Sequence, residues 1–182
     1  RIGSLYNLGH RHPEIRQAVM DALVQLEVGL AYYLSGWRAQ AAEKLAASTG
    51  GVLPGVSWAA SGSEANEAAL KAARGFTGRR KIVTLDDCYH GHTGLMIAAG
   101  GNDGDKDRYL VSYPDEFSRV PWDDLDAMDA AVGTDTAAVL LEALLAKNGF
   151  REPSPGYYAG VLDICRQNGA LLIVDEVITG VG

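Results

Sequence analysis

The sequence predicts an α/β fold, in which a mostly parallel sheet carries helices on both faces. Strand-like apolar runs alternate with helical segments along the chain, which is the order that parallel β-α-β units produce. The runs at 137–141 and 170–174 are apolar throughout, as expected for strands buried on both faces. With 182 residues and 47% hydrophobic content, the chain is long and apolar enough for a sizeable core.

The first half of the chain is predicted to begin with an amphipathic helix. Pro13 favours the first position of a helix, and apolar residues then recur at helical spacing until a stop at Gly29. These apolar residues are Ile15, Val19, Leu23 and Leu26. The other elements expected here are helices at 39–48 and 65–74 and strands at 56–60 and 81–85.

The second half continues the alternation. Pro121 and the aspartates after it begin a helix that Gly133 ends. The last strand delivers Asp175 and Glu176 at its carboxyl end. The remaining elements expected are a short element at 95–99, strands at 109–112 and 137–141, and a helix at 155–167.

Composition excludes several classes of partner. The net charge of −7 argues against a nucleic-acid or anionic-membrane surface, because both favour basic patches. Cys88 and Cys165 lie far apart and outside any CxxC spacing, which favours structural thiols in a reducing compartment.

The sequence shows no leader-like or membrane-spanning run, so we expect a cytoplasmic protein. It starts at Arg1 and stops at Gly182 shortly after a strand, so we expect a fragment of a longer protein.

The segment Ser61-Gly62-Ser63-Glu64 connects a predicted strand to a predicted helix. Ser61 and Glu64 have the spacing of a capping box. Gly62 lets the backbone approach a ligand, the first amides of the helix point outward, and Ser63 adds a hydroxyl, which together make a phosphate cradle. Taken alone, the segment also fits an ordinary capped helix. It is not a Walker loop, because no GK[ST] follows.

Four further residues follow or end predicted strands. Tyr89 and His90 follow the strand at 81–85, where an aromatic ring can stack on a flat heterocycle. A core tyrosine with a solvated tip fits the same position. Glu142 and Asp175 end later strands, and Asp175 alone also fits a turn-capping residue. In a parallel sheet all four lie at the edge where α/β proteins bind ligands.

The histidines form two H-x-H pairs, His10 with His12 and His90 with His92. No established metal-binding pattern includes either pair, so we expect no metal site. A phosphate cradle, an aromatic ring and two acids at one edge instead indicate a flat, phosphorylated, nitrogen-bearing cofactor. An acid beside the ring nitrogen keeps it protonated, because opposite charges at close range favour both ionised forms.

Four motifs, in this order, carry a family resemblance: NLGHRHPEI at 7–15, SGSEANEAALKAAR at 61–74, YHGHT at 89–93 and GALLIVDEVITGVG at 169–182. Through them nearly the whole chain resembles the class III, pyridoxal-phosphate-dependent aminotransferases. The resemblance implies fold type I, with a mostly parallel seven-stranded sheet in a large domain, a smaller domain from both chain ends, and a homodimer. It implies that residues 1–38 lead into the large domain and that residues 39–182 form its first, incomplete part.

The resemblance also implies where pyridoxal phosphate binds. The phosphate is expected on the amides of Gly62 and Ser63 and on the Ser63 hydroxyl. The pyridine ring is expected between Tyr89 on one face and Val177 on the other. Asp175 is expected to bind the ring nitrogen.

Two more residues match the family's site, and two features depart from its pattern. His90 is expected beside Tyr89, and Glu142 matches the family's acid near the ring hydroxyl. Where the family usually has proline after this glutamate, this chain has Ala143. The Schiff-base lysine of these enzymes lies beyond Gly182, and none of the lysines present occupies its motif. We therefore expect the isolated chain to be inactive.

For the intact protein, the resemblance implies pyridoxal-phosphate-dependent transfer of an amino group between an amino acid or amine and a keto acid or aldehyde. Three alternatives remain. One is an aminomutase resembling glutamate-1-semialdehyde aminomutase, suggested by ARGFTGRRKIV at 73–83 and CYHGHT at 88–93. Another is a decarboxylating enzyme of the dialkylglycine type. The third is a non-catalytic fragment that only binds the cofactor weakly.

Overall fold

The computed structural model describes residues 7–25, 35–113 and 115–180. The chain forms two compact units, Arg1–Trp58 and Ala59–Gly182. The boundary predicted between residues 38 and 39 concerns the domains of the intact protein and stays a prediction. None of the helices in the described ranges combines the length and apolar character needed to cross a bilayer.

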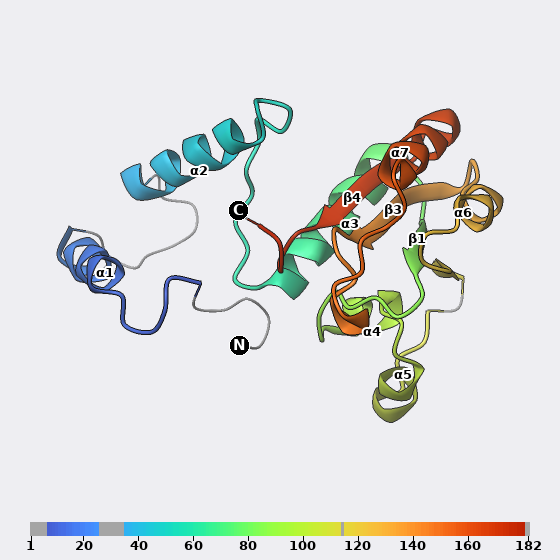
Figure 1. Cartoon of the computed structure of the whole chain (residues 1–182), viewed down its shortest axis with the longest axis horizontal. Coiled ribbons are helices and arrows are strands. Elements are labelled where there is room, and N and C mark those ends of the chain that lie inside the picture. Colours follow the sequence, from blue (N-terminus) through green and yellow to red (C-terminus); the bar gives the residue numbers. More distant parts are fainter. Residues whose placement is uncertain (1–6, 26–34, 114, 181–182) are drawn as a thin grey trace. The chain divides into compact units, whose positions relative to one another are not determined.

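The first unit contains the helices α1 (Pro13–Gln25) and α2 (Gly36–Ser48) (Figure 1). Helix α1 begins at Pro13, as predicted. The apolar residues that mark its helical spacing are exposed where the structure describes them, and both Leu26 and Gly29 lie outside the described residues. Helix α2 begins before the predicted residue 39, because Ser35 Oγ accepts a hydrogen bond from the Arg38 amide and caps it.

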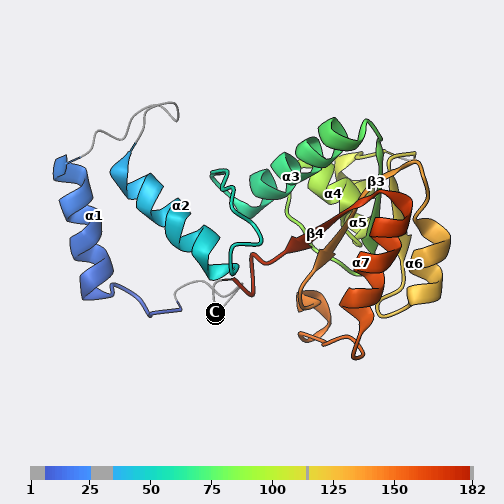
Figure 2. The same cartoon turned by 90° about the horizontal axis from the view of Figure 1, so that it is seen from above.

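The second unit is built on four parallel strands, which confirms the predicted sheet (Figure 2). Their order across the sheet is β2-β1-β3-β4, so the carboxyl ends of all four lie at one edge. The strands are β1 (Lys81–Leu85), β2 (Phe117–Val120), β3 (Thr136–Glu142) and β4 (Leu171–Asp175).

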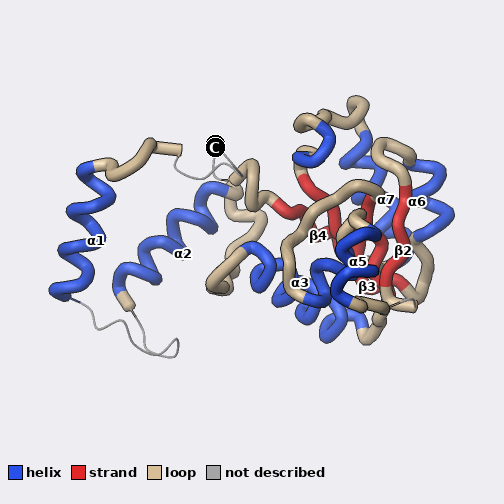
Figure 3. The backbone as a smooth tube through the Cα atoms, turned by 90° about the horizontal axis from the view of Figure 1, so that it is seen from below, coloured by secondary structure: helices blue, strands red, loops and turns tan. Residues whose placement is uncertain are grey.

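Helices cover both faces of the sheet, as predicted (Figure 3). Helices α3 (Gly62–Thr77) and α4 (Gly94–Ala99) pack on one face. Helices α6 (Leu125–Ala131) and α7 (Tyr157–Asn168) pack on the other. The connections also hold helix α5 (Asp103–Tyr109) and a 3₁₀ turn, η1 (Ala146–Asn148).

Alternating residues of the central strands divide the core into two layers. In β1, Val83 and Leu85 join the layer under α6 and α7, whereas Ile82 joins the layer under α3 and α4. In β3, Val139 and Leu140 divide in the same way. Side chains of a strand point alternately to opposite faces, so a strand with helices on both sides is apolar along its whole length.

Two expectations about strands were wrong, and one strand was missed. Residues 56–60 form no strand, because no described strand pairs with them, and all but Val56 are exposed. Residues 109–112 begin with the end of α5, which stops where Leu110 takes a left-handed conformation. The strand in this region is β2, whose Ser118 and Arg119 break the apolar pattern that predicts strands.

Strand β4 also differs from the expectation of burial on both faces. It is an edge strand in the described sheet, and Leu171, Leu172, Ile173 and Val174 all retain exposed surface. An apolar run predicts a strand, but it does not tell which neighbours the strand has within this chain.

We expect Leu140→Ala to lower the free energy of unfolding of the 182-residue chain by about 2–5 kcal/mol, because it leaves a cavity in the centre of the sheet. Leu140 is fully buried. The matched control is Phe76→Ala, since Phe76 on α3 is 82% exposed and little surface is lost there. Urea denaturation of both variants measures the difference, and equal effects would contradict the described core.

Candidate functional site

All seven residues that the sequence predicts for the site line one cavity of about 150 Å³. It lies at the carboxyl ends of β1, β3 and β4, beside the start of α3. The predicted residues are Gly62, Ser63, Tyr89, His90, Glu142, Asp175 and Val177, and the cavity is completed by Gly91 and Ile178.

Ser61 caps the start of α3, as predicted, but Glu64 bonds the amide of the preceding residue and not the Ser61 amide that a capping box uses. Ser61 Oγ accepts a hydrogen bond from the Glu64 amide at 3.2 Å, and Glu64 Oε2 accepts one from the Ala60 amide at 2.8 Å. The amides of Gly62 and Ser63 belong to the first turn, so they have no acceptor within the helix. They are available to an anion beside the positive end of the helix dipole.

Two glycines allow the walls of this cradle to approach each other closely. A Cβ atom on Gly91, which has φ of +126°, would lie 1.9 Å from Ser63 Oγ. A Cβ atom on Gly62 would lie 2.8 Å from Val177 Cγ2. The Ser63 hydroxyl accepts a hydrogen bond from the His92 amide at 3.2 Å, which leaves its hydrogen free to be donated.

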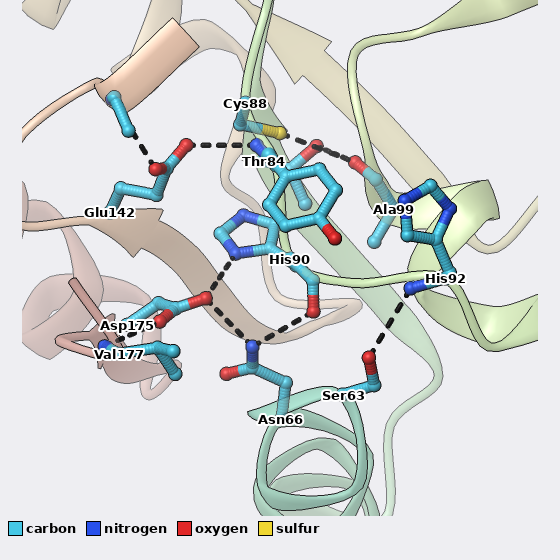
Figure 4. Close-up of polar contacts among 12 residues, drawn as sticks. Ser63, Asn66, Thr84, Cys88, His90, His92, Ala99, Glu142, Asp175 and Val177 are labelled. Atoms are coloured by element: carbon cyan, nitrogen blue, oxygen red, sulfur yellow. Dashed lines mark hydrogen bonds and ion pairs between the residues drawn. The ribbon is translucent and has the colours of Figure 1, made fainter. Parts of the chain in front are cut away.

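A buried polar cluster surrounds Asp175, one of the residues that line the cavity (Figure 4). The carboxylate of Asp175 accepts hydrogen bonds at both oxygens. His90 Nδ1 lies 2.8 Å from Oδ2, and Asn66 Nδ2 lies 2.7 Å from the same oxygen. The Val177 amide donates to Oδ1 at 3.0 Å. His90 Nε2 is also buried but has no hydrogen-bond partner among the described residues.

The two titratable groups of the cluster, His90 and Asp175, have shifted pKa values. Burial lowers the pKa of His90, but its hydrogen bond to Asp175, with contributions from Cys88, outweighs burial and raises the pKa to about 9. Burial also opposes ionisation of Asp175, yet the hydrogen bonds from His90 and Val177 hold its pKa below the usual value. The pair is therefore an imidazolium beside a carboxylate at neutral pH.

Glu142 anchors the loop that carries the aromatic ring. Its Oε1 accepts a hydrogen bond from the Tyr89 amide at 2.8 Å, and its Oε2 accepts one from the Ala146 amide at 3.4 Å. Burial raises the pKa of Glu142, against the effect of these hydrogen bonds. The Tyr89 ring itself is 45% exposed and meets His92 edge to face, with 5.3 Å between ring centroids.

The structure shows what Ala143 does in place of the family's proline. Its amide donates a hydrogen bond to the Asp175 carbonyl at 3.2 Å, which continues the β3–β4 pairing beyond Glu142. Proline has no amide hydrogen for this bond. The Ala143 amide therefore adds a backbone hydrogen bond between the strand ends that carry Glu142 and Asp175.

Sequence reasoning missed three residues of the site, Asn66, Gly91 and Ile178. Asn66 carried a signal, because it shares the buried stripe of α3 with Leu70 and Ala73 and is the one polar residue there. Gly91 carried none. Glycine is needed there because a Cβ atom would collide with Ser63, which is distant in sequence.

The H-x-H pairs do not build a metal site in the described ranges, where no cluster of three His, Cys, Asp or Glu is arranged around a common point. His90 is buried against Asp175, whereas His92 is exposed and contacts Tyr89.

Comparison with known proteins gives a consistent picture. Residues 2–182 match the family model described as aminotransferase class-III. An uncharacterized aminotransferase of Archaeoglobus fulgidus is 42% identical over 180 residues, which are 99% of this chain and 42% of that protein. The acetylornithine aminotransferase of Mycobacterium leprae is 39% identical over 176 residues, 96% of this chain and 43% of that protein. The chain thus spans less than half the length of these relatives.

Solved structures share the fold. The ornithine aminotransferase of Toxoplasma gondii matches with a TM-score of 0.85 at 26% identity, over 98% of this chain and 43% of that one. A taurine:2-oxoglutarate aminotransferase of Bifidobacterium kashiwanohense, in complex with PLP and glutamate, matches with a TM-score of 0.84 at 28% identity. The match covers 96% of this chain and 44% of that one. A glutamate-1-semialdehyde-aminomutase of Pseudomonas aeruginosa matches with a TM-score of 0.78 at 25% identity, over 91% of this chain and 37% of that one.

We expect the stabilising effect of His90 to disappear in alkali. Its pKa of about 9 in the folded protein lies above 6.5, the ordinary value for a histidine. Protonation of His90 therefore contributes stability that is fully present below pH 6.5 and is lost as the pH rises through about 9. Below pH 6.5 the wild type should be more stable than His90→Gln. This difference in the free energy of unfolding should shrink by on the order of 1–3 kcal/mol as the pH rises through about 9.

Urea denaturation at a series of pH values measures this difference. His92→Gln is the matched control, because that exposed imidazole has no carboxylate partner among the described residues. A difference for His90→Gln that stays constant from pH 6 to 10 would contradict the ion pair.

Proposed function

The chain belongs to the class-III aminotransferases, and from this membership we propose that the full-length protein transfers an amino group with pyridoxal phosphate as cofactor. The donor is an amino acid or amine, and the acceptor is a keto acid or aldehyde. One observation carries the proposal: a helix-start cradle, a buried carboxylate and an accessible aromatic residue line the same cavity.

The residues present fit the cofactor at both of its charged ends. The amides of Gly62 and Ser63 and the Ser63 hydroxyl suit a phosphate, and the close approach of Gly91 leaves no room for a side chain in the cradle. Asp175 suits the ring nitrogen, because three donors hold its carboxylate ionised. Its Oδ2 accepts from both His90 and Asn66, whereas Oδ1 accepts one hydrogen bond, from the Val177 amide, and keeps a lone pair for the ring N–H.

The faces of the ring are assigned to two partly exposed side chains. Tyr89 is 45% exposed and Val177 is 55% exposed, so both offer apolar surface that a flat ring would bury. Val177 is held against Gly62, and the Tyr89 backbone is held by Glu142. We assign to Glu142 the placement of this loop and a position near the ring hydroxyl.

When bound, pyridoxal phosphate supplies a ring that withdraws electrons from the bond broken at the substrate carbon. The chain's own residues make the site suitable for that chemistry. Asp175 keeps a proton on the ring nitrogen by charge pairing, and His90 keeps Asp175 charged by its own positive charge. The cradle fixes the orientation of the cofactor.

We further propose a cytoplasmic homodimer in which residues 39–182 form the first part of the large domain and residues 1–38 lead into it. The exposed apolar residues Ile15, Val19 and Leu23 of α1 support a covering partner. Both cysteines are free and buried, which supports a reducing compartment.

The aminomutase remains the second candidate, since a solved aminomutase shares this fold. The two functions differ in their need for a separate acceptor. We expect turnover of the full-length protein to require an added keto acid or aldehyde, as monitored by the change in cofactor absorbance with each half-reaction. Turnover of a single amino substrate without an acceptor would support the aminomutase instead.

We expect Asp175→Asn to reduce kcat of the full-length protein by about 100-fold or more, because a neutral amide cannot keep the ring nitrogen protonated. Steady-state assays at saturating cofactor measure this loss. Asp163→Asn, on an exposed position of α7, is the matched control and should retain activity. Unchanged kcat for Asp175→Asn would remove Asp175 from the proposed role.

We expect the lysine that bonds covalently to the cofactor to lie outside residues 1–182. None of the described residues that line the cavity is a lysine, although Lys147 lines a smaller neighbouring cavity with Tyr89 and His90. Borohydride treatment of the cofactor-loaded full-length protein, followed by peptide mass spectrometry, identifies the attached lysine. Attachment at Lys147 would contradict the expectation.

A further inference from the structure

Asn66 is a polar residue in an apolar position. It shares the buried stripe of α3 with Leu70 and Ala73, and only 5% of it is exposed. Asparagine disfavours helix interiors, and a buried amide without partners is strongly destabilising. A residue of this kind in this position needs specific hydrogen bonds.

Both partners of the Asn66 amide are acceptors. Its Nδ2 donates to Asp175 Oδ2 at 2.7 Å and to the His90 carbonyl at 3.2 Å (Figure 4). Because a carboxylate oxygen and a carbonyl oxygen both require a donor, the amide nitrogen and not its oxygen must face them. Its two hydrogens are therefore assigned to two different elements, β4 and the loop after β1.

Asn66 differs from His90 in the kind of donor that it provides. An amide keeps its hydrogens at every accessible pH, whereas an imidazole donates or loses its proton. With the Val177 amide on Oδ1 and Asn66 on Oδ2, each oxygen of Asp175 faces a donor that never titrates. The titratable groups around Asp175 are His90, with Cys88 near it, and Glu142 at the end of β3.

We propose that Asn66 is a positioning residue for Asp175, which holds the carboxylate in one orientation and in its ionised form so that it can pair with the cofactor's ring nitrogen. The inference rests on the proposed function, because it concerns the same site. It adds a residue from the second turn of α3, so the helix that supplies the phosphate cradle also supports the carboxylate in the same cavity.

Two substitutions separate this role from simple packing. Asn66→Leu removes the donor and keeps an apolar helix face. Asn66→Asp keeps the shape but places a second carboxyl group 2.7 Å from Asp175, where the two must share a proton. Leu70→Ala is the matched control, because Leu70 is fully buried one turn further along α3 and its apolar side chain cannot donate a hydrogen bond to Asp175.

The first measurement is pyridoxal-phosphate retention by the full-length protein as a function of pH. In wild type, retention should persist on the acid side until Asp175 is protonated. In both Asn66 variants the pH below which the cofactor is lost, the acid limb of the retention curve, should move upward by about one pH unit. The dissociation constant of pyridoxal phosphate at pH 7.5 should rise about tenfold or more. Leu70→Ala should lower the melting temperature and leave the acid limb in place.

The second measurement needs no cofactor. In ¹³C-aspartate-labelled protein, the Asp175 carboxyl signal, assigned by its loss in Asp175→Asn, should titrate at higher pH in Asn66→Leu than in wild type. If neither Asn66 variant changes this titration and both behave like Leu70→Ala, Asn66 is only a packing residue and the inference is overturned. If wild type fails to retain pyridoxal phosphate, the proposed function fails, and the Asp175 titration still decides the role of Asn66.

Discussion

The site depends on keeping one carboxylate charged while most of it is withdrawn from water. Burial opposes the ionisation of Asp175, and three donors from three different places reverse that effect: His90 from the loop after β1, Asn66 from α3 and the Val177 amide just past β4. Each donor reaches Asp175 only if the element that carries it is correctly placed beside β4. The ionised form of Asp175 therefore depends on the parallel order of β1, β3 and β4, as the packing of the core does.

The sequence allowed much of this arrangement to be predicted, because the signals are local or follow from parallel topology. A capped helix start at Ser61 is visible in four consecutive residues, and strand ends that carry Tyr89, Glu142 and Asp175 must meet at one edge once the strands are parallel. Asn66 and Gly91 were not predicted, because their roles arise from contacts with residues far away along the chain.

The errors about strands have a related cause. Hydrophobic pattern indicates that a segment can be buried, but pairing decides whether it becomes a strand and how much of it is covered. Residues 56–60 have a strand-like pattern and no described partner, β2 has a partner and a weak pattern, and β4 has a partner on one side within the described sheet. Pattern and pairing agree in β1 and β3, which are the strands with neighbours on both sides.

The contact between Glu142 and Tyr89 has a consequence for how such a site can diverge. The carboxylate holds the Tyr89 backbone amide and not its hydroxyl, so the path of the loop is independent of the side chain at that position. Any aromatic residue at position 89 would therefore occupy the same place. The ring that faces the ligand can therefore be exchanged for one with different electronic character while the backbone stays unchanged. Substitutions at this position can alter the reactivity of the site without altering the stability of the fold.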